Sequence, residues 1–149
     1  MNGKPFDTNN KILSREDLAV EVRRRQAAGE PGVFTNGCFD LLHLGHVRYL
    51  QNARSLGDFL ILALNSDEGV RLLKGSGRPL VSEDERAEIL AALTCIDYVT
   101  IFHEPTAGPL VAFVQPAPAL LGRALRQLFA LHMALAKSSL RFELPETVV

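Results

Sequence analysis

Two histidines, His43 and His46, are separated by two residues, one of which is the glycine Gly45. They follow a short apolar run at 33–35 and stand where a helical pattern begins, at about residue 44. In an open α/β sheet, ligands bind beyond the carboxyl ends of the strands, and the start of a helix directs free backbone N–H groups at anions. Both imidazoles can therefore face one phosphate group, and Gly45 lets a nucleotide approach the backbone closely.

Other interpretations of this pair are open. Histidines three residues apart also occur as surface or helix-capping features, and histidine is a common zinc ligand. The zinc alternative lacks a third ligand near His43 and His46 in the sequence. The phosphate interpretation gains weight from its surroundings, because Gly37, Phe39 and Asp40 precede the first histidine in a segment between a strand and a helix.

The elements that must position these residues alternate along the chain. Ser14 begins a helical pattern that ends near Gly29, and Ser82 with Glu85 forms a capping box before another helix. The run 59–64 is apolar throughout, as expected for a strand buried on both faces of a parallel sheet. The alternation of strands and helices along the chain predicts an α/β fold with a Rossmann-like parallel sheet flanked by helices. The expected strands are 33–35, 59–64 and 98–102, and the helices that follow the first strand are 44–56, 68–73, 86–93 and 106–114.

Composition narrows the classes of function. The chain has 149 residues, enough for a single domain; 47% are hydrophobic, 22% are charged, and the net charge is −1. We therefore expect no general affinity for nucleic acid or for anionic membranes.

The first ten residues carry no apolar signal segment and no uncharged apolar run reaches membrane-spanning length, so a cytoplasmic protein is expected. Cys38 and Cys95 fit no disulfide or metal pattern, and we expect reduced thiols.

The segment 34–50, which contains both histidines, resembles the HxGH region of the cytidylyltransferase-like nucleotidyltransferase superfamily. Within the superfamily, the similarity is greatest to the adenylyltransferase domain that makes ADP-heptose from heptose 1-phosphate. The likeness covers about residues 11–116 of a single domain that spans 1–149. The further matching pieces, in order, are 65–67, 73–75, Arg78 with Pro79, Arg86 with 89–90, and 97–99.

The resemblance implies a reaction in which an oxygen of a sugar phosphate attacks the α-phosphorus of ATP and pyrophosphate leaves. That oxygen is already anionic near neutral pH, so the reaction needs positioning and charge stabilisation and no general base. By resemblance, His43 and His46 would donate hydrogen bonds to the phosphates, and Lys74 and Arg78 would hold the incoming phosphate. Mg²⁺ would bridge the triphosphate, with no metal site made by the protein alone. The residues that the resemblance assigns to nucleotide binding are Asn36, Gly37, Cys38, Phe39, Asp40, Gly45 and Arg86.

Beyond residue 116 the likeness ends. The family continues into a strand and a Lys-Gly-Gly-Asp-Tyr loop that helps to close over the nucleotide, and neither that loop nor a later Ser/Thr-rich motif stands in this sequence. Residues 117–141 contain no Asp or Glu and are dominated by Ala and Leu, with Arg and Gln among the other good helix formers, which favours a helix over about 119–137. A shifted reading frame and true divergence both fit this segment. We expect an atypical helical C-terminus over 117–149, a less enclosed nucleotide, low turnover, and a homodimer formed through leftover apolar surface.

Two other functions are compatible with the sequence. One is a cytidylyltransferase acting on glycerol 3-phosphate or a similar polyol phosphate, because the base is read by the part of the fold that is altered here. The other is a catalytically weak nucleotide-binding or assembly subunit that keeps only the HxGH half of the site. The missing loops favour the weak binder. The enzyme is favoured by the intact set of His43, Gly45, His46, Lys74 and Arg86.

Overall fold

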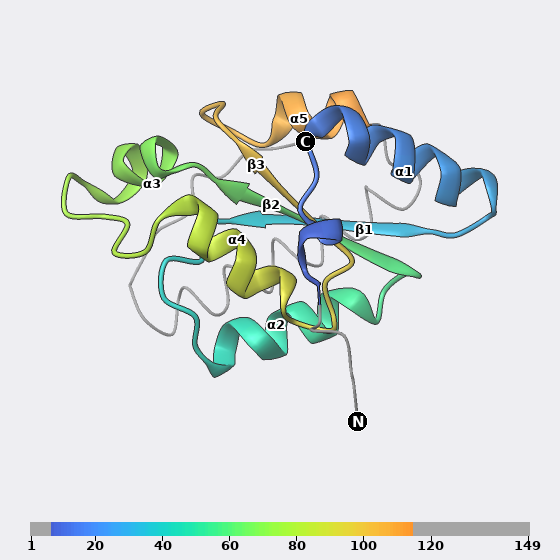
Figure 1. Cartoon of the computed structure of the whole chain (residues 1–149), viewed down its shortest axis with the longest axis horizontal. Coiled ribbons are helices and arrows are strands. Elements are labelled where there is room, and N and C mark those ends of the chain that lie inside the picture. Colours follow the sequence, from blue (N-terminus) through green and yellow to red (C-terminus); the bar gives the residue numbers. More distant parts are fainter. Residues whose placement is uncertain (1–6, 115–149) are drawn as a thin grey trace, which may run out of the picture.

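Three parallel strands form the centre of the structure, a computed structural model that describes residues 7–114. Strand β1 (Gly32–Gly37) pairs with β2 (Phe59–Asn65), and β2 pairs with β3 (Tyr98–Phe102). Because all three strands run the same way, their carboxyl ends meet at one edge of the sheet (Figure 1). The predicted α/β class, a Rossmann-like parallel sheet flanked by helices, is confirmed.

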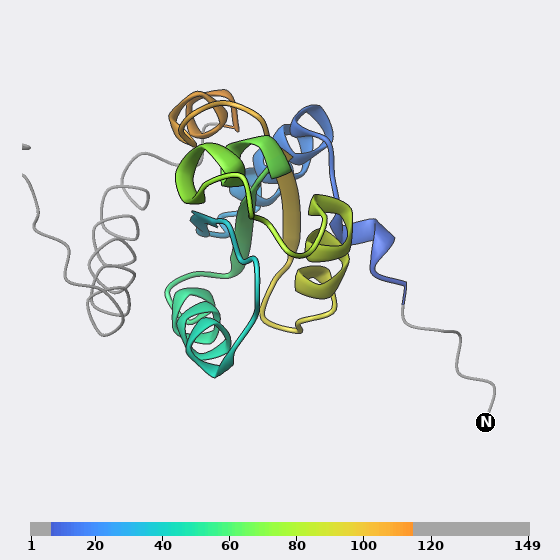
Figure 2. The same cartoon turned by 90° about the vertical axis from the view of Figure 1, so that its left-hand side faces the viewer.

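Helices cover both faces of this sheet. Helices α1 (Arg15–Ala27) and α5 (Gly108–Val114) lie against one face, and α2 (Leu44–Arg54) and α4 (Glu83–Ala91) lie against the other (Figures 1 and 2). The sheet is therefore the middle of three layers. In this class of fold, ligands bind beyond the carboxyl ends of the strands, which points to the segments that follow β1 and β2.

Strand β2 is buried along its whole length, as its apolar sequence predicts. Successive side chains of a strand point to opposite faces, so one strand supplies two separate cores. The core against α2 and α4 takes Leu60, Leu62 and Leu64, and the core against α1 and α5 takes Phe59, Ile61 and Ala63. The strand thereby fixes both helical layers to the sheet.

Serine side chains begin three of the helices in the part of the chain that the structure describes. The hydroxyl of Ser14 accepts the amide N–H of Asp17 at the start of α1, and Ser66 does the same for Gly69 at the start of α3 (Asp67–Lys74). Ser82 begins α4 with the predicted capping box. These caps satisfy N–H groups that have no partner inside the helix.

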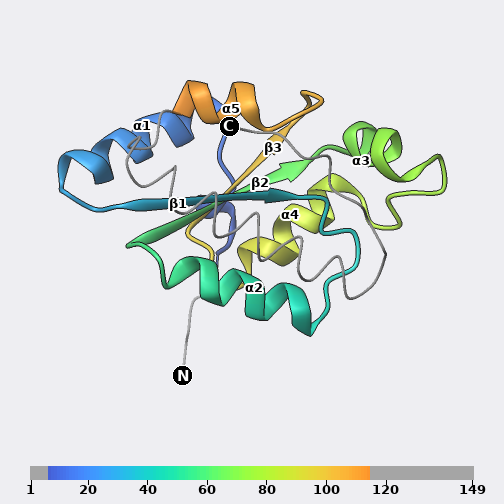
Figure 3. The same cartoon turned by 180° about the vertical axis from the view of Figure 1, so that it is seen from behind.

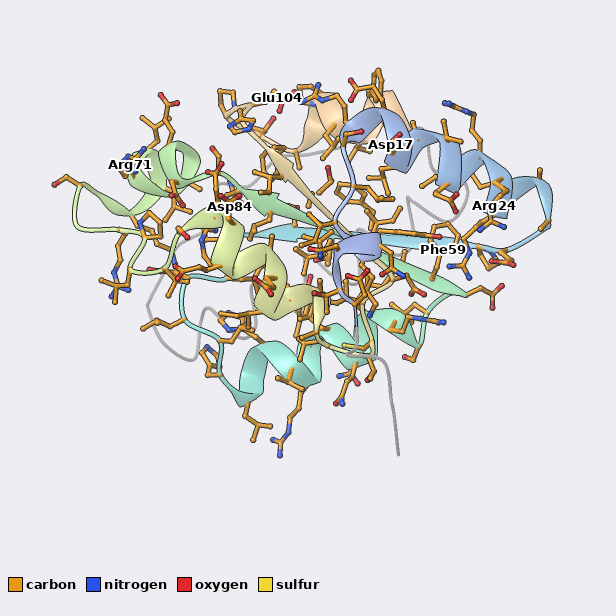
Figure 4. The ribbon with its side chains drawn as sticks, in the orientation of Figure 1. Asp17, Arg24, Phe59, Arg71, Asp84 and Glu104 are labelled. Atoms are coloured by element: carbon orange, nitrogen blue, oxygen red, sulfur yellow. The ribbon has the colours of Figure 1, made fainter. Side chains whose placement is uncertain are left out.

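The amino-terminal edge of the sheet is held by ion pairs around Asp97. Its carboxylate accepts the Leu60 amide N–H at 2.8 Å and lies 3.0 Å from Arg54 of α2 and 3.5 Å from Arg25 of α1. The Arg25 guanidinium also lies over the Phe59 ring, 4.5 Å from its centroid. Figure 4 shows Phe59 at this edge, with α1 beside it. One carboxylate thus connects both helical layers to the strands.

The segment before α1 is ordered by contacts that the sequence analysis did not foresee. The 3-10 helix η1 (Asn9–Lys11) places the Lys11 ammonium 2.8 Å from the Ile96 carbonyl and 3.2 Å from the Leu93 carbonyl, just beyond α4. Ile12 then forms a parallel bridge with Val99 of β3.

All the residues predicted for the site lie within residues 7–114. The predicted helix at 119–137, and the whole segment 117–149 that departs from the family pattern, lie outside the described residues. Over residues 7–114 no helix combines the length and the apolar character needed to cross a membrane.

Candidate functional site

The turn after β1 brings the predicted nucleotide-binding residues to the carboxyl edge of the sheet. Asn36 and Gly37 end the strand, and the chain then turns through Phe39, whose φ of 44° lies in the left-handed region. A Cβ at Gly37 would lie 2.8 Å from the Phe39 ring, so only glycine lets that ring fold back against the strand. Figure 3 shows how this segment leads from the end of β1 to the start of α2. A left-handed conformation at a buried phenylalanine is costly, as is common at functional sites.

His43 is both the N-cap of α2 and half of a stacked pair of imidazoles. Its Nδ1 accepts the amide N–H of Gly45 at 3.1 Å, and its ring centroid lies 4.0 Å from that of His46. An acceptor Nδ1 leaves the proton of the neutral ring on Nε2, which is therefore the donor available to a ligand. The Phe39 ring, 5.2 Å from His46, supports the pair from the other side of the turn.

Gly45 leaves room for this arrangement as well as for a ligand. A Cβ at position 45 would lie 2.8 Å from Cε1 and 2.9 Å from Nδ1 of His43, closer than real Cβ atoms come to their neighbours. Any side chain at this position would push the imidazole away from its place. The glycine between the histidines is thus explained by the position of His43 itself.

Asp40 is buried and ties the β1–α2 turn to the loop between α3 and α4. Its carboxylate accepts the Leu80 amide at 2.7 Å and the Val81 amide at 3.4 Å, and it pairs with Arg78 at 2.8 Å. Burial raises the pKa of Asp40, but these hydrogen bonds and the Arg78 charge outweigh it and hold the pKa below its ordinary value. Asp40 is therefore an anion at neutral pH that organises the loop carrying Arg78.

Arg86 is the largest buried side chain of the described residues, with 1% of its surface exposed. Its Nε donates to the Val81 carbonyl at 3.0 Å, and its Nη1 donates to the carbonyls of Cys38 at 2.6 Å and Asn65 at 2.9 Å. Its Nη2 pairs with Asp67 at 2.6 Å. Arg86 thus contacts the segments that follow β1 and β2 and the residues just before α4.

Lys74 and Arg78 occupy the loop that faces the turn after β1. Lys74 is exposed and ends α3, immediately before Gly75, whose φ of 96° suits glycine. Burial raises the pKa of the Cys38 thiol, and the positive charges of Lys74 and Arg86 oppose that rise. Arg78 joins this loop to the β1 turn through its pair with Asp40, and Lys74 stands four residues before Arg78, at the end of α3.

The structure also brings in residues that the sequence analysis did not assign to the site. Asp67 pairs with Arg86 through its carboxylate, and its amide donates to Glu83 of α4 at 2.6 Å. The sequence signals for Asp67 are its place two residues after the end of β2 and its membership of the family-like piece 65–67. No group of three or more His, Cys, Asp or Glu side chains in the described part of the chain could hold a metal ion.

A protein-family model described as cytidylyltransferase-like matches residues 34–115, which is more than half of the chain. The chain belongs to the cytidylyltransferase-like family. The matched region begins within β1 and contains every predicted site residue, including the stacked histidines. It makes the chain a nucleotidyltransferase-type domain, as the HxGH resemblance implied.

Curated relatives are similar to about three quarters of the chain. The chain is 60% identical over 110 residues to the bifunctional protein HldE of Pelobacter propionicus and 59% identical over 113 residues to that of Syntrophotalea carbinolica. Each match covers 74% of this chain but only 22% and 23% of the respective relative. The chain therefore spans about a quarter of the length of these relatives.

A solved structure supports the fold at lower identity. The lipopolysaccharide core biosynthesis protein from Thermoplasma volcanium GSS1 is 31% identical, with a TM-score of 0.52 over 59% of this chain and 70% of that one. The sequence-based assignment to the HxGH superfamily is confirmed by these likenesses together.

Proposed function

We propose that this chain is an adenylyltransferase that joins a sugar 1-phosphate, D-glycero-β-D-manno-heptose 1-phosphate, to ATP and releases pyrophosphate. The observation that carries the proposal is the stacked pair of His43 and His46 at the start of α2, at the carboxyl edge of a parallel sheet. The substrate class is supported by the resemblance to the ADP-heptose-forming domain and by relatives named bifunctional protein HldE.

In this reaction a phosphate oxygen of the sugar attacks the α-phosphorus of ATP. A new P–O bond forms, the bond between the α-phosphorus and the bridging oxygen to the β-phosphate breaks, and the electron pair leaves on pyrophosphate. Negative charge grows on the α- and β-phosphates, so donors fixed in advance stabilise the transition state. His43 supplies such a donor through Nε2, because Nδ1 is already bonded to Gly45. The backbone N–H groups at the start of α2 add positive electrostatic potential, which stabilises the same negative charge on the phosphates.

The phosphate of the incoming sugar needs positive charge on the side of the site opposite to His43. Lys74 is exposed at the end of α3, four residues before the Arg78 that pairs with Asp40 of the β1 turn, and we expect it to hold the sugar phosphate against the α-phosphate. Arg78 shares its guanidinium with Asp40 and has 42% of its side chain exposed, which leaves one side available to the same anion. Mg²⁺ would arrive on the triphosphate and would neutralise part of its charge, with phosphate oxygens and water as its ligands.

The alternative within the enzyme class is a cytidylyltransferase for glycerol 3-phosphate or a similar polyol phosphate. The observation in its favour is that the matched family model is itself cytidylyltransferase-like. The same phosphate chemistry serves either base, so the choice between ATP and CTP depends on contacts to the base.

The decisive experiment measures pyrophosphate release by the purified full chain. ATP and CTP are each combined with heptose 1-phosphate and with glycerol 3-phosphate, with Mg²⁺ present. Release only with ATP and heptose 1-phosphate supports the proposal, and release only with CTP and glycerol 3-phosphate supports the alternative. Nucleotide binding without release in any combination would show a catalytically weak binding subunit instead.

We further propose that the protein works in the cytoplasm, where ATP and sugar phosphates are available, and that it forms a homodimer. The dimer is suggested by the sequence of 117–141 alone, in which leucine and alanine predominate and offer apolar surface to a second copy. Light scattering coupled to gel filtration at several concentrations measures the mass. A monomer at all concentrations would refute the dimer.

A further inference from the structure

We propose that Arg86 acts in this reaction as a positioning residue, in place of the direct phosphate contact that the family resemblance implies. Its guanidinium holds the segment that carries Lys74 against the turn that leads to His43. The proposal rests on the proposed function for its kinetic consequences, whereas the structural consequences can be measured without any substrate.

The first argument is the saturation of the guanidinium. Arginine has five N–H donors in a rigid planar fork, and four of them in Arg86 already have acceptors. Three of these acceptors are backbone carbonyls, which remain in place whatever ligand is bound. With 1% of its surface exposed, Arg86 cannot turn toward a phosphate without leaving buried carbonyls unsatisfied.

The second argument is which parts of the chain Arg86 connects. It bonds to Asp67 at the start of α3 and to Val81 at the end of the following loop, so it holds both ends of the segment 67–81. Lys74 lies in the middle of that segment. The same guanidinium binds the Cys38 carbonyl in the turn that leads to His43. Arg86 therefore helps to set the position of Lys74 relative to the turn, from both ends of the segment.

The third argument is that Val81 is held from both sides. Its carbonyl accepts from Arg86, and its amide N–H donates to Asp40. Asp40 stands two residues after Cys38, so the contacts close into a ring through the β1 turn. Figures 1 and 3 show α3 and the start of α4 side by side at this edge of the sheet. A ring of this kind transmits the loss of one member to the others.

The test uses two substitutions for which the two roles predict different results. Asp67→Asn removes a negative charge and frees Arg86, so a direct phosphate ligand would bind nucleotide equally well or more tightly in this variant. A positioning residue would instead lose one of its anchors. Arg86→Lys keeps the charge but cannot span the four acceptors with a tetrahedral ammonium. Arg24→Lys is the matched control, because Arg24 lies on α1 at the opposite end of the molecule from Arg71 and Asp84 (Figure 4).

If Arg86 is a positioning residue, kcat falls in both variants, by about a hundredfold in Arg86→Lys, because a misplacement of about 1 Å has that effect. The KM for ATP changes by no more than about twofold, since in this role Arg86 makes no contact of its own with the nucleotide. In amide hydrogen exchange, segment 75–82 exchanges about tenfold faster or more than in the wild type. Residues 59–64 of β2 keep their protection, which separates a loosened loop from general unfolding. The Arg24→Lys protein behaves as the wild type in every measurement.

The proposal is overturned if segment 75–82 keeps its wild-type exchange in both variants. It is also overturned if Arg86→Lys raises the KM for ATP with kcat unchanged, which is the result expected of a direct ligand. Should Arg86→Lys fail to fold, Asp67→Asn carries the test, because the Asp67 side chain is 28% exposed and its amide analogue fits the same space. If the wild type released no pyrophosphate, the proposed function would fail, and the exchange measurement would still decide whether Arg86 holds the loop.

Discussion

The imidazoles of His43 and His46 lie with their ring centroids 4.0 Å apart and their planes inclined by 31°. The amide of Gly45 fixes the tautomer of His43 and so decides which nitrogen can donate. In the proposed reaction His43 would therefore be oriented as a hydrogen-bond donor through Nε2 before any nucleotide binds.

Replacing either histidine by alanine is expected to remove most turnover and leave the fold intact. Loss of one preorganised donor to developing charge costs on the order of 3 kcal/mol, a hundredfold or more in rate. Pyrophosphate release gives the rate, and thermal unfolding followed by circular dichroism checks the fold. A variant that keeps nearly the wild-type rate would show that its histidine does not stabilise the transition state.

The Gly45→Ala variant should separate activity from stability. The new methyl group displaces the His43 ring, so turnover falls by about tenfold to a hundredfold. Replacing glycine by alanine within a helix favours the helix by about 1 kcal/mol, which offsets the local crowding. We therefore expect a melting temperature close to that of the wild type together with a low kcat. Equal rates for the two proteins would mean that the His43 position is unimportant.

Lys74→Ala is expected to weaken binding of the sugar phosphate more than binding of the nucleotide. Lysine is a mobile point charge, and here it stands just before a glycine-rich loop that can follow an incoming anion. Steady-state kinetics should show a raised KM for heptose 1-phosphate and a nearly unchanged KM for ATP. Arg71→Ala, one turn earlier on the exposed surface of α3, is the comparison for a general change of charge. If both substitutions raised this KM equally, the effect would come from the net charge of the surface and not from a contact made by Lys74.

Asp40 should make stability depend on pH in the acid range. Its folded-state pKa is lowered, so its ionised form stabilises the fold above the unfolded pKa of about 3.9. This contribution is lost as the pH falls through the folded pKa. Asp40→Asn is therefore expected to lower the free energy of unfolding by about 2 kcal/mol at pH 7. Urea unfolding at pH 7 and pH 3 measures the difference, which should shrink at the lower pH. A constant difference would contradict the assigned ion pair.

Much of the fold follows from local patterns in the sequence. Strand β3 begins and ends at the predicted residues, and the Ser14 and Ser82 caps stand at the predicted helix starts. Strand β1 is longer than the predicted 33–35, because pairing with β2 extends it into Asn36 and Gly37, whose side chains give no signal for a strand.

The surroundings of Arg86 could not be predicted in the same way. It stands among charged residues in the first turns of α4, a pattern typical of an exposed helix face. Its burial results from the docking of α4 against the ends of β1 and β2, which is a property of the tertiary structure. The pairing with Asp67 is equally hidden, since 19 residues separate the two in the chain. The resemblance placed Arg86 in the site, and the structure adds which groups it bonds.

The Asp97 ion pairs lie at the amino-terminal edge of the sheet, and His43 and its neighbours lie at the other edge. The seven residues of β2 separate these edges by about 20 Å. Substitutions so far apart, with no shared contacts, usually have additive effects. A lineage could therefore adapt the domain to a hotter habitat through Arg25, Arg54 and Asp97 without altering its choice of substrate. Changes of substrate at the carboxyl edge could accumulate equally freely.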